Sequence, residues 1–104
     1  MKTVYIAGPM RGLPENNAKA FFDAFEKLRN EGWHPIDPTL FNEVFGCVET
    51  EELLKACMDA ELAAIPHLDA IFLLKGWEKS EGAKKELEVA LRNGLEVILQ
   101  EGCP

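Results

Sequence analysis

The chain alternates short strand-like segments with segments of helical periodicity, and this alternation limits its possible folds more than any other feature. The first segment, 3–7, is apolar and rich in β-branched and aromatic residues, as expected of a buried strand. Further strands are expected at 33–37, 70–74 and 95–99. Apolar strands that are separated by helices form parallel sheets covered on both faces. The sequence therefore predicts a small doubly wound α/β domain, flavodoxin-like or Rossmann-like, with about four parallel strands and helices on both faces.

Three helices are predicted between these strands, at about 17–31, 51–65 and 81–93. Thr50 and Ser80 are suitable N-caps for the second and third helices because their hydroxyls accept hydrogen bonds from free backbone N–H groups. A glycine or proline follows each helix and ends it. Apolar side chains at helical spacing define the faces expected to turn inward in the first and third helices: Phe21, Phe22, Phe25 and Leu28, and Ala83, Leu87, Ala90 and Leu91.

The chain is acidic, with 11 Lys and Arg residues against 18 Asp and Glu residues and a net charge of −7. A negative protein repels the phosphate backbone of nucleic acids, and no basic run or basic helix face offsets this average. The longest apolar stretch, 70–74, is far too short to cross a bilayer, and the first residues show no signal-peptide pattern. We therefore expect a cytoplasmic protein that binds neither nucleic acids nor membranes.

Nothing in the composition divides the 104 residues into separate parts. The sequence contains no repeat, low-complexity segment or linker, so we expect one domain over residues 1–104. A domain of this size buries only about two thirds of its unfolded surface, so further stabilisation by self-association, as a homodimer or higher oligomer, is compatible with its size but not required by it. The cysteines Cys47, Cys57 and Cys103 are odd in number and lack the spacing of paired ligands, so we expect reduced thiols and no zinc site.

Glu61 is one of two carboxylates that fall where a charge is costly. A helical wheel places it within the apolar stripe of the second predicted helix, with Met58 and Ile65, whereas Asp59 lies on the far side. A glutamate in an apolar stripe needs a partner or a raised pKa, and raised pKa values are common among functional groups. The alternative is that Glu61 lies near the sheet edge, where it reaches solvent or pairs with a lysine.

Glu86 is the second such carboxylate, at the flank of the third predicted helix. It follows Gly82 by one turn, and the missing side chain of this glycine would let a ligand approach the carboxylate. The alternative is an ordinary glutamate on a solvated helix. The solvated face of this helix is expected to form two i, i+4 ion pairs, Glu81 with Lys85 and Lys84 with Glu88.

The loop after the first strand, Gly8-Pro9-Met10-Arg11-Gly12, suits an anion. Its glycines permit close approach of the backbone, and the guanidinium of Arg11 can form a bidentate contact. The loop matches neither the GxGxxG pattern nor a P-loop. The hydroxyl of Ser80 at a helix N-terminus would also favour a phosphate, although an ordinary N-cap explains it equally. Trp77 can either stack on a base or fill a gap in the packing.

Two segments of the chain resemble the nucleoside 2-deoxyribosyltransferase superfamily, and more narrowly its short bacterial and phage members of unassigned function. They are Tyr5-Ile6-Ala7-Gly8-Pro9-Met10-Arg11-Gly12 and residues 69–90, which contain Gly76-Trp77-Glu78-Lys79-Ser80-Glu81-Gly82-Ala83-Lys84-Lys85-Glu86-Leu87. The resemblance covers nearly the whole chain. In that superfamily a glycine four residues before a glutamate, followed by Leu and then Ala, marks the catalytic helix. The matching residues of this chain are Gly82, Glu86, Leu87 and Ala90.

The resemblance implies that Glu86 is a nucleophile that attacks the anomeric carbon of a 2′-deoxyribose, expels the base and forms a glycosyl-enzyme ester. Water or another base then takes the sugar with net retention. The superfamily also has an acid eight residues before the aspartate of the third strand, and Glu61 holds this position before Asp69. The implied role of Glu61 is to orient Glu86 or the base and to assist proton transfer to the leaving group.

The functional branch that this chain is most similar to is the deoxynucleoside 5′-monophosphate N-glycosidases. That branch has a serine six residues before the nucleophile, where the transferases have an aspartate, and Ser80 matches the serine. Arg11 matches an arginine in the first loop of the branch. The resemblance thus implies a homodimer without a metal or cofactor. It also implies a substrate site that includes Tyr5, Gly8, Arg11, Ser80 and Gly82.

The leading expectation is therefore an N-glycosidase that acts on a 2′-deoxynucleoside 5′-monophosphate or a related nucleotide, with 2-deoxyribosyl transfer between bases as a variant. Two other classes of function are open. The same cleft could bind a nucleotide without cleaving it, in which case binding occurs and no product forms. The helix flank with Gly82 and Glu86 could instead be a subunit contact, in which case a Gly82→Trp variant changes the mass of the assembly.

Overall fold

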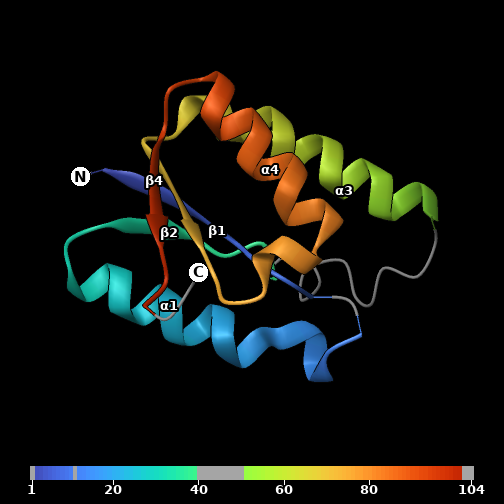
Figure 1. Ribbon diagram of the computed structural model, residues 1–104, viewed down its shortest axis with the longest axis horizontal. Coiled ribbons are helices and arrows are strands. Elements are labelled where there is room, and N and C mark those ends of the chain that lie inside the picture. The colour runs from blue at the N-terminus through green and yellow to red at the C-terminus, as the bar shows by residue number, and fades with distance from the viewer. Residues whose placement is uncertain (1, 11, 40–50, 102–104) are drawn as a thin grey trace.

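Four parallel strands form a single sheet at the centre of the molecule (Figure 1). The computed structural model describes residues 2–10, 12–39 and 51–101 of the chain. Within these residues the sheet has the order β2-β1-β3-β4. This arrangement confirms the prediction of a small, parallel, doubly wound α/β fold. The strands are β1 (Thr3–Ala7), β2 (His34–Ile36), β3 (Ala70–Leu73) and β4 (Glu96–Leu99).

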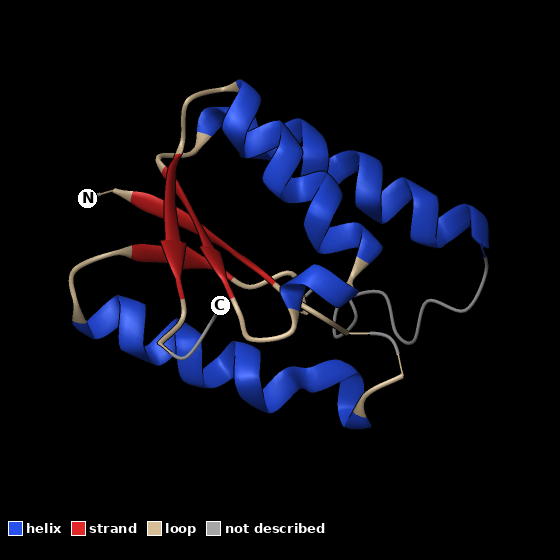
Figure 2. Ribbon diagram, in the orientation of Figure 1, coloured by secondary structure: helices blue, strands red, loops and turns tan. Residues whose placement is uncertain are grey.

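Helices cover both faces of the sheet, as Figure 2 shows. The helix α1 (Ala18–Asn30) packs on one face, and α3 (Glu51–Ala64) and α4 (Glu81–Arg92) lie on the other. No helix in the described part of the chain is long and apolar enough to cross a membrane. In the described part of the chain, three short 3-10 helices lie in the connections: η1 (Pro14–Asn17), η2 (Ile65–His67) and η3 (Trp77–Lys79).

The side chains of β1 point alternately to the two faces of the sheet and divide the core into two layers. Val4 and Ile6 belong to the layer under α1. Tyr5 and Ala7 belong to the layer under α3 and α4, and the pairing of Tyr5 with Ile71 continues this layer into β3. The hydroxyl of Tyr5 is therefore carried into the space between the sheet and the two C-terminal helices.

Two apolar residues that the sequence predicts to face inward are exposed. Phe22 is 55% exposed and Leu91 is 60% exposed. The residues that α1 buries are Phe21, Ala24 and Leu28, which follow one another at spacings of three and four. This stripe is narrower than the predicted one because α1 packs on the sheet from one side only, so residues about 100° beyond the stripe reach solvent.

The surface ion pairs of α4 also differ from the prediction. Lys84 Nζ lies 3.4 Å from Glu81 Oε1, and Arg92 Nη2 lies 2.5 Å from Glu88 Oε1. Among the described residues these pairs replace the expected contacts of Lys85 with Glu81 and of Lys84 with Glu88. All four side chains in the observed pairs are well exposed to water, so the choice between these partners has little effect on stability.

The strand β4 is less buried than the sequence predicts. Val97 is 38% exposed and Leu99 is 47% exposed, and Glu96 is exposed as well. Ile98 packs against the layer under α1. The expectation of a strand covered on both faces is wrong here because, within the described residues, β4 is at the edge of the sheet and has a neighbouring strand on one side only.

Four residues named in the sequence predictions lie outside the described residues. They are Arg11, Cys47, the expected N-cap Thr50, and Cys103.

Candidate active site

Three polar side chains from different elements meet in the layer between the sheet and the helices α3 and α4. Tyr5 comes from β1, Glu61 from α3 and Glu86 from α4, and their exposed fractions are 1%, 8% and 4%. The hydroxyl of Tyr5 donates a hydrogen bond to Oε2 of Glu86. Glu61 is close enough to affect the pKa values of both other groups. The two acids singled out by the sequence therefore lie together in a buried layer.

Helical periodicity turns both carboxylates inward. Glu61 precedes the buried Ile65 by four residues, and Glu86 precedes the buried Ala90 by four residues on α4. These apolar residues determine how each helix is rotated about its axis, so the glutamates are held against the sheet. No lysine or arginine of the described residues forms an ion pair with either glutamate. The alternatives of a solvated Glu86 and of a solvent-exposed or lysine-paired Glu61 do not match this arrangement.

Burial raises the pKa of Glu86 from 4.5 to about 8. Removal from water disfavours the charged form of a carboxyl group, and the neighbouring charge of Glu61 raises the pKa further. The hydrogen bond from Tyr5 acts in the opposite direction because it stabilises the carboxylate. Burial is the largest of these effects, so Glu86 holds a proton at neutral pH in the free protein.

The pKa values of the other two groups of the cluster are also raised. Burial raises the pKa of Glu61, although hydrogen bonding to Glu86 and Tyr5 opposes the shift. Burial, together with the negative charges of both glutamates, raises the pKa of Tyr5 well above 10 and keeps its phenol neutral. Because the two carboxyls interact, they titrate as a pair and not as independent groups. With one proton bound, such a pair offers one acid and one carboxylate at the same time, which a nucleophile and its acid partner require.

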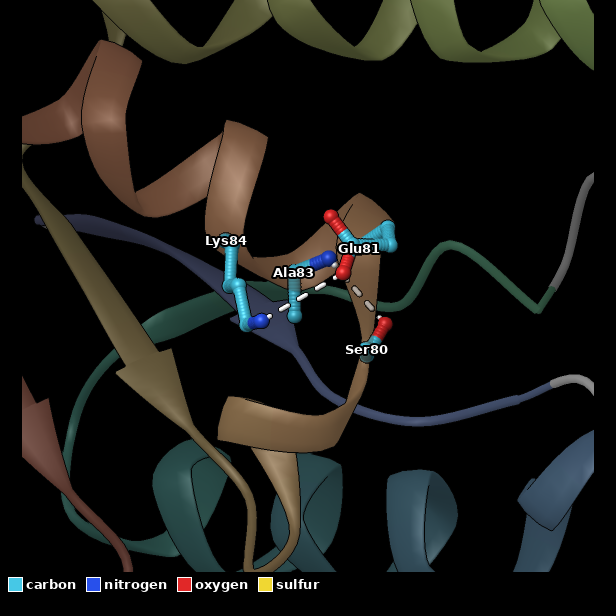
Figure 3. A network of polar contacts seen from close by, with 4 residues as sticks. All are labelled: Ser80, Glu81, Ala83 and Lys84. Carbon is cyan, nitrogen blue, oxygen red and sulfur yellow. Dashed lines mark hydrogen bonds and ion pairs between the residues drawn. The ribbon is translucent and has the colours of Figure 1, made fainter.

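Ser80 caps the helix that carries Glu86. Its Oγ accepts a hydrogen bond from the backbone N–H of Ala83 at 3.1 Å, and Lys84 pairs with Glu81 in the same turn (Figure 3). The prediction of Ser80 as an N-cap is confirmed. Ser80 precedes Glu86 by six positions, which corresponds to about 9 Å along the helix axis.

The two glycines expected at the substrate site each lie close to another part of the chain. A Cβ atom on Gly8 would lie 2.7 Å from Cβ of Leu74, so the missing side chain lets the end of β1 pass close to that residue. A Cβ atom on Gly82 would lie 2.9 Å from Cε of Met58. The space beside Gly82 therefore holds a side chain of α3, and Gly82 lets α3 and α4 approach closely within one chain.

Asp37 carries a carboxylate that is only 7% exposed, and the sequence pattern gave this residue no role in the site. Asp37 follows β2 directly, and its Oδ1 accepts hydrogen bonds from the backbone N–H and the hydroxyl of Thr39 at 2.8 and 2.6 Å. An acid directly after a strand is a sequence signal for this end of a parallel sheet, where ligands bind in doubly wound folds. The observed contacts are those of a local turn.

The 3-10 helix η3 carries two buried polar atoms that have no hydrogen-bond partner among the described residues, Nε1 of Trp77 and Oε2 of Glu78. Trp77 also packs against the apolar layer under α4. Its contacts agree with the interpretation in which the ring fills a gap in the packing. In the part of the chain that the structure describes, no group of three or more His, Cys, Asp or Glu side chains is placed to hold a metal ion.

Comparison with known proteins gives one family. A model described as "Domain of unknown function (DUF4406)" matches residues 2–99. The chain belongs to this family. The DUF4406 match spans all four strands and includes Tyr5, Glu61 and Glu86, so the cluster lies within the family domain. The description of the DUF4406 family names no activity, and no curated protein gives a significant match to the chain.

Proposed function

We propose that this DUF4406 protein is an N-glycosidase that cleaves the bond between base and sugar in a 2′-deoxynucleoside 5′-monophosphate or a related nucleotide. The observation that carries the proposal is the buried cluster of Tyr5, Glu61 and Glu86, which three separate segments bring together. The resemblance to the nucleoside 2-deoxyribosyltransferases supports the choice of substrate. The proposal includes a cytoplasmic location, where such nucleotides are available.

In the first step the carboxylate of Glu86 attacks the anomeric carbon and forms an ester with the sugar. The bond between that carbon and the base nitrogen breaks, and its electron pair leaves with the base. Glu61 donates a proton to the departing base. The pair of carboxyls holds one proton at this stage, and the step requires that proton on Glu61. Positive charge that develops at the anomeric carbon stabilises the ionised form of Glu86 and so favours this placement.

In the second step water completes the hydrolysis. Glu61 is now ionised and accepts a proton from a water molecule while the water oxygen attacks the anomeric carbon. The ester bond to Glu86 breaks, and 2-deoxyribose 5-phosphate leaves with net retention of configuration. The cluster returns to its starting state with one proton. A second base in place of water would give 2-deoxyribosyl transfer through the same ester.

Tyr5 supports both steps through Glu86. Its hydroxyl donates to Oε2 of that residue, and its raised pKa keeps the hydroxyl protonated over the whole physiological range. A neutral donor of this kind stabilises the carboxylate both before attack and after the ester breaks. In this proposal Tyr5 is therefore a positioning residue for the nucleophile.

Incubation of the full chain with a panel of substrates tests the proposal. The panel contains deoxynucleoside 5′-monophosphates, the matching ribonucleotides and the free deoxynucleosides, and chromatography measures free base and 2-deoxyribose 5-phosphate. We expect release of base from a deoxynucleoside monophosphate, and we expect excess of a second base to reveal any transfer. If calorimetry shows that a nucleotide binds, and no product forms after prolonged incubation, the chain is a nucleotide-binding protein and not an enzyme.

A substitution at Ser80 tests where the phosphate lies. Ser80→Asp keeps a capping side chain on α4 but places a negative charge beside the proposed phosphate, so kcat/KM for the monophosphate should fall about 10-fold or more. The matched control is Ser80→Asn, which also caps the helix and adds no charge. With the free deoxynucleoside, the two variants should have equal kcat/KM. A loss in Ser80→Asp that is the same for both substrates would contradict a phosphate at this position.

A further inference from the structure

The two edges of the sheet differ in their ability to accept another strand. The edge formed by β2 is only three residues long, and its central residue is Pro35. The backbone N–H of the neighbouring His34 points into the sheet and donates to the carbonyl oxygen of Lys2. The next backbone nitrogen along the strand points outward, and it belongs to Pro35, which has no N–H group. A proline and a short length commonly protect an edge strand from pairing with a further strand. The opposite edge, β4, has the sequence EVIL and carries neither proline nor lysine.

Among the described residues, no strand pairs with the outer side of the β4 backbone. Glu96 and Gln100 donate their N–H groups to the carbonyl oxygens of Asp69 and Leu73, at 3.1 and 2.9 Å. Successive backbone groups of a strand point to opposite sides, so the N–H and C=O groups of Val97 and Leu99 point away from β3. Among the described residues β3 is the only strand that pairs with β4.

Apolar side chains accompany these backbone groups. Val97 and Leu99 are partners of Ile71 and Leu73 in the register with β3, so they lie on the face of the sheet that α4 covers. They are 38% and 47% exposed. An exposed apolar edge strand readily pairs with another strand and is normally covered in a native protein.

We propose that a second copy of this chain covers this edge, with the two β4 strands paired antiparallel across a two-fold axis. The axis passes beside Ile98, which then faces its own copy on the α1 side of the sheet. Val97 of one chain lies opposite Leu99 of the other, and each of these residues both donates and accepts a backbone hydrogen bond. The result is one continuous sheet of eight strands built from a self-complementary contact.

The charges along the strand favour a second copy in this register. Each chain carries a net charge of −7, so self-association requires a surface where like charges do not meet. In the proposed pairing Glu96 lies opposite Gln100 of the partner, and Glu101 lies opposite Leu95. No acidic residue of the strand faces another across the axis. Net repulsion between the two chains should still weaken the dimer at low salt, and added salt should strengthen it.

Analytical ultracentrifugation of the full chain tests the proposal, at concentrations from about 10 µM to 1 mM because the interface is small. We expect an assembly of twice the chain mass of 11.6 kDa. The double variant Val97→Lys, Leu99→Lys should raise the dissociation constant at least about 10-fold, since it places charges in the apolar contact. The matched control is Phe22→Lys, which changes an exposed apolar residue on α1 and should leave the dimer intact.

Amide hydrogen exchange in the unsubstituted chain provides a second measurement that does not depend on how the variants fold. The amides of Val97 and Leu99 should become protected as the chain concentration rises. A monomer at every concentration, a dimer that survives the double lysine variant, or exchange at these two amides that is independent of concentration would each overturn the proposal. The outcome is separate from the proposed glycosidase activity, because the contact involves no residue of the Tyr5, Glu61 and Glu86 cluster.

Discussion

Replacement of Glu86 by glutamine is expected to lower the release of base from a deoxynucleoside 5′-monophosphate at least about 10³-fold, because the amide cannot form the ester with the sugar. The change keeps the size of the side chain and its capacity to accept a hydrogen bond from Tyr5, so the fold should be retained. Chromatographic measurement of free base, with circular dichroism to monitor the fold, checks this expectation.

The control for this experiment lies two residues further along the same helix. Glu88→Gln makes the same chemical change at an exposed side chain that pairs with Arg92, and its turnover should stay within about twofold of the unsubstituted chain. Mass spectrometry of acid-quenched reactions adds a direct test, since the ester between the sugar phosphate and the chain should form with Glu88→Gln and not with Glu86→Gln. If turnover is unchanged in Glu86→Gln, Glu86 is not the nucleophile.

The architecture could be predicted from the sequence because it depends on local patterns. The apolar run of β1, the capping serine before α4 and the spacing of Phe21 and Leu28 on α1 each reflect a short-range rule. The order of the strands is not a local property. Nothing within 95–99 states that β4 is an edge, so the exposure of Val97 and Leu99 became evident only once the strands were placed side by side.

The candidate site was predictable in part for the same reason. A helical wheel reports that a charge falls on an apolar face, which identified Glu61 and drew attention to Glu86. The wheel cannot report which strand lies beneath the helix. The hydrogen bond from Tyr5 to Glu86 joins residues 81 positions apart in the chain and depends on how the central strand β1 lies under α4. The contact of Gly82 with Met58 likewise depends on the packing of two helices.

The second large effect expected at Glu86 concerns stability and pH. The pKa of Glu86 is about 8 in the folded protein and 4.5 for the free side chain, so the folded state binds this proton more tightly than the unfolded state. Its contribution to stability is therefore fully present below pH 4.5 and is lost as the pH rises toward 8. The loss approaches about 1.4 kcal/mol for each pH unit within this window. The raised pKa of Glu61 gives a contribution of the same sign.

Glu86→Gln should remove this loss because glutamine does not ionise. The free energy of unfolding of the variant, relative to that of the unsubstituted chain, should rise steadily from pH 5 to about pH 8 and then level off. Urea unfolding at closely spaced pH values measures the difference, with Glu88→Gln as the control for the same change in an exposed position. A variant more stable than the parent at alkaline pH, yet inactive, would mean that the parent retains a destabilising buried carboxyl for its chemistry. Two parallel stability curves for the parent and Glu86→Gln would instead mean that Glu86 is ionised in the folded state, with no proton to share with Glu61.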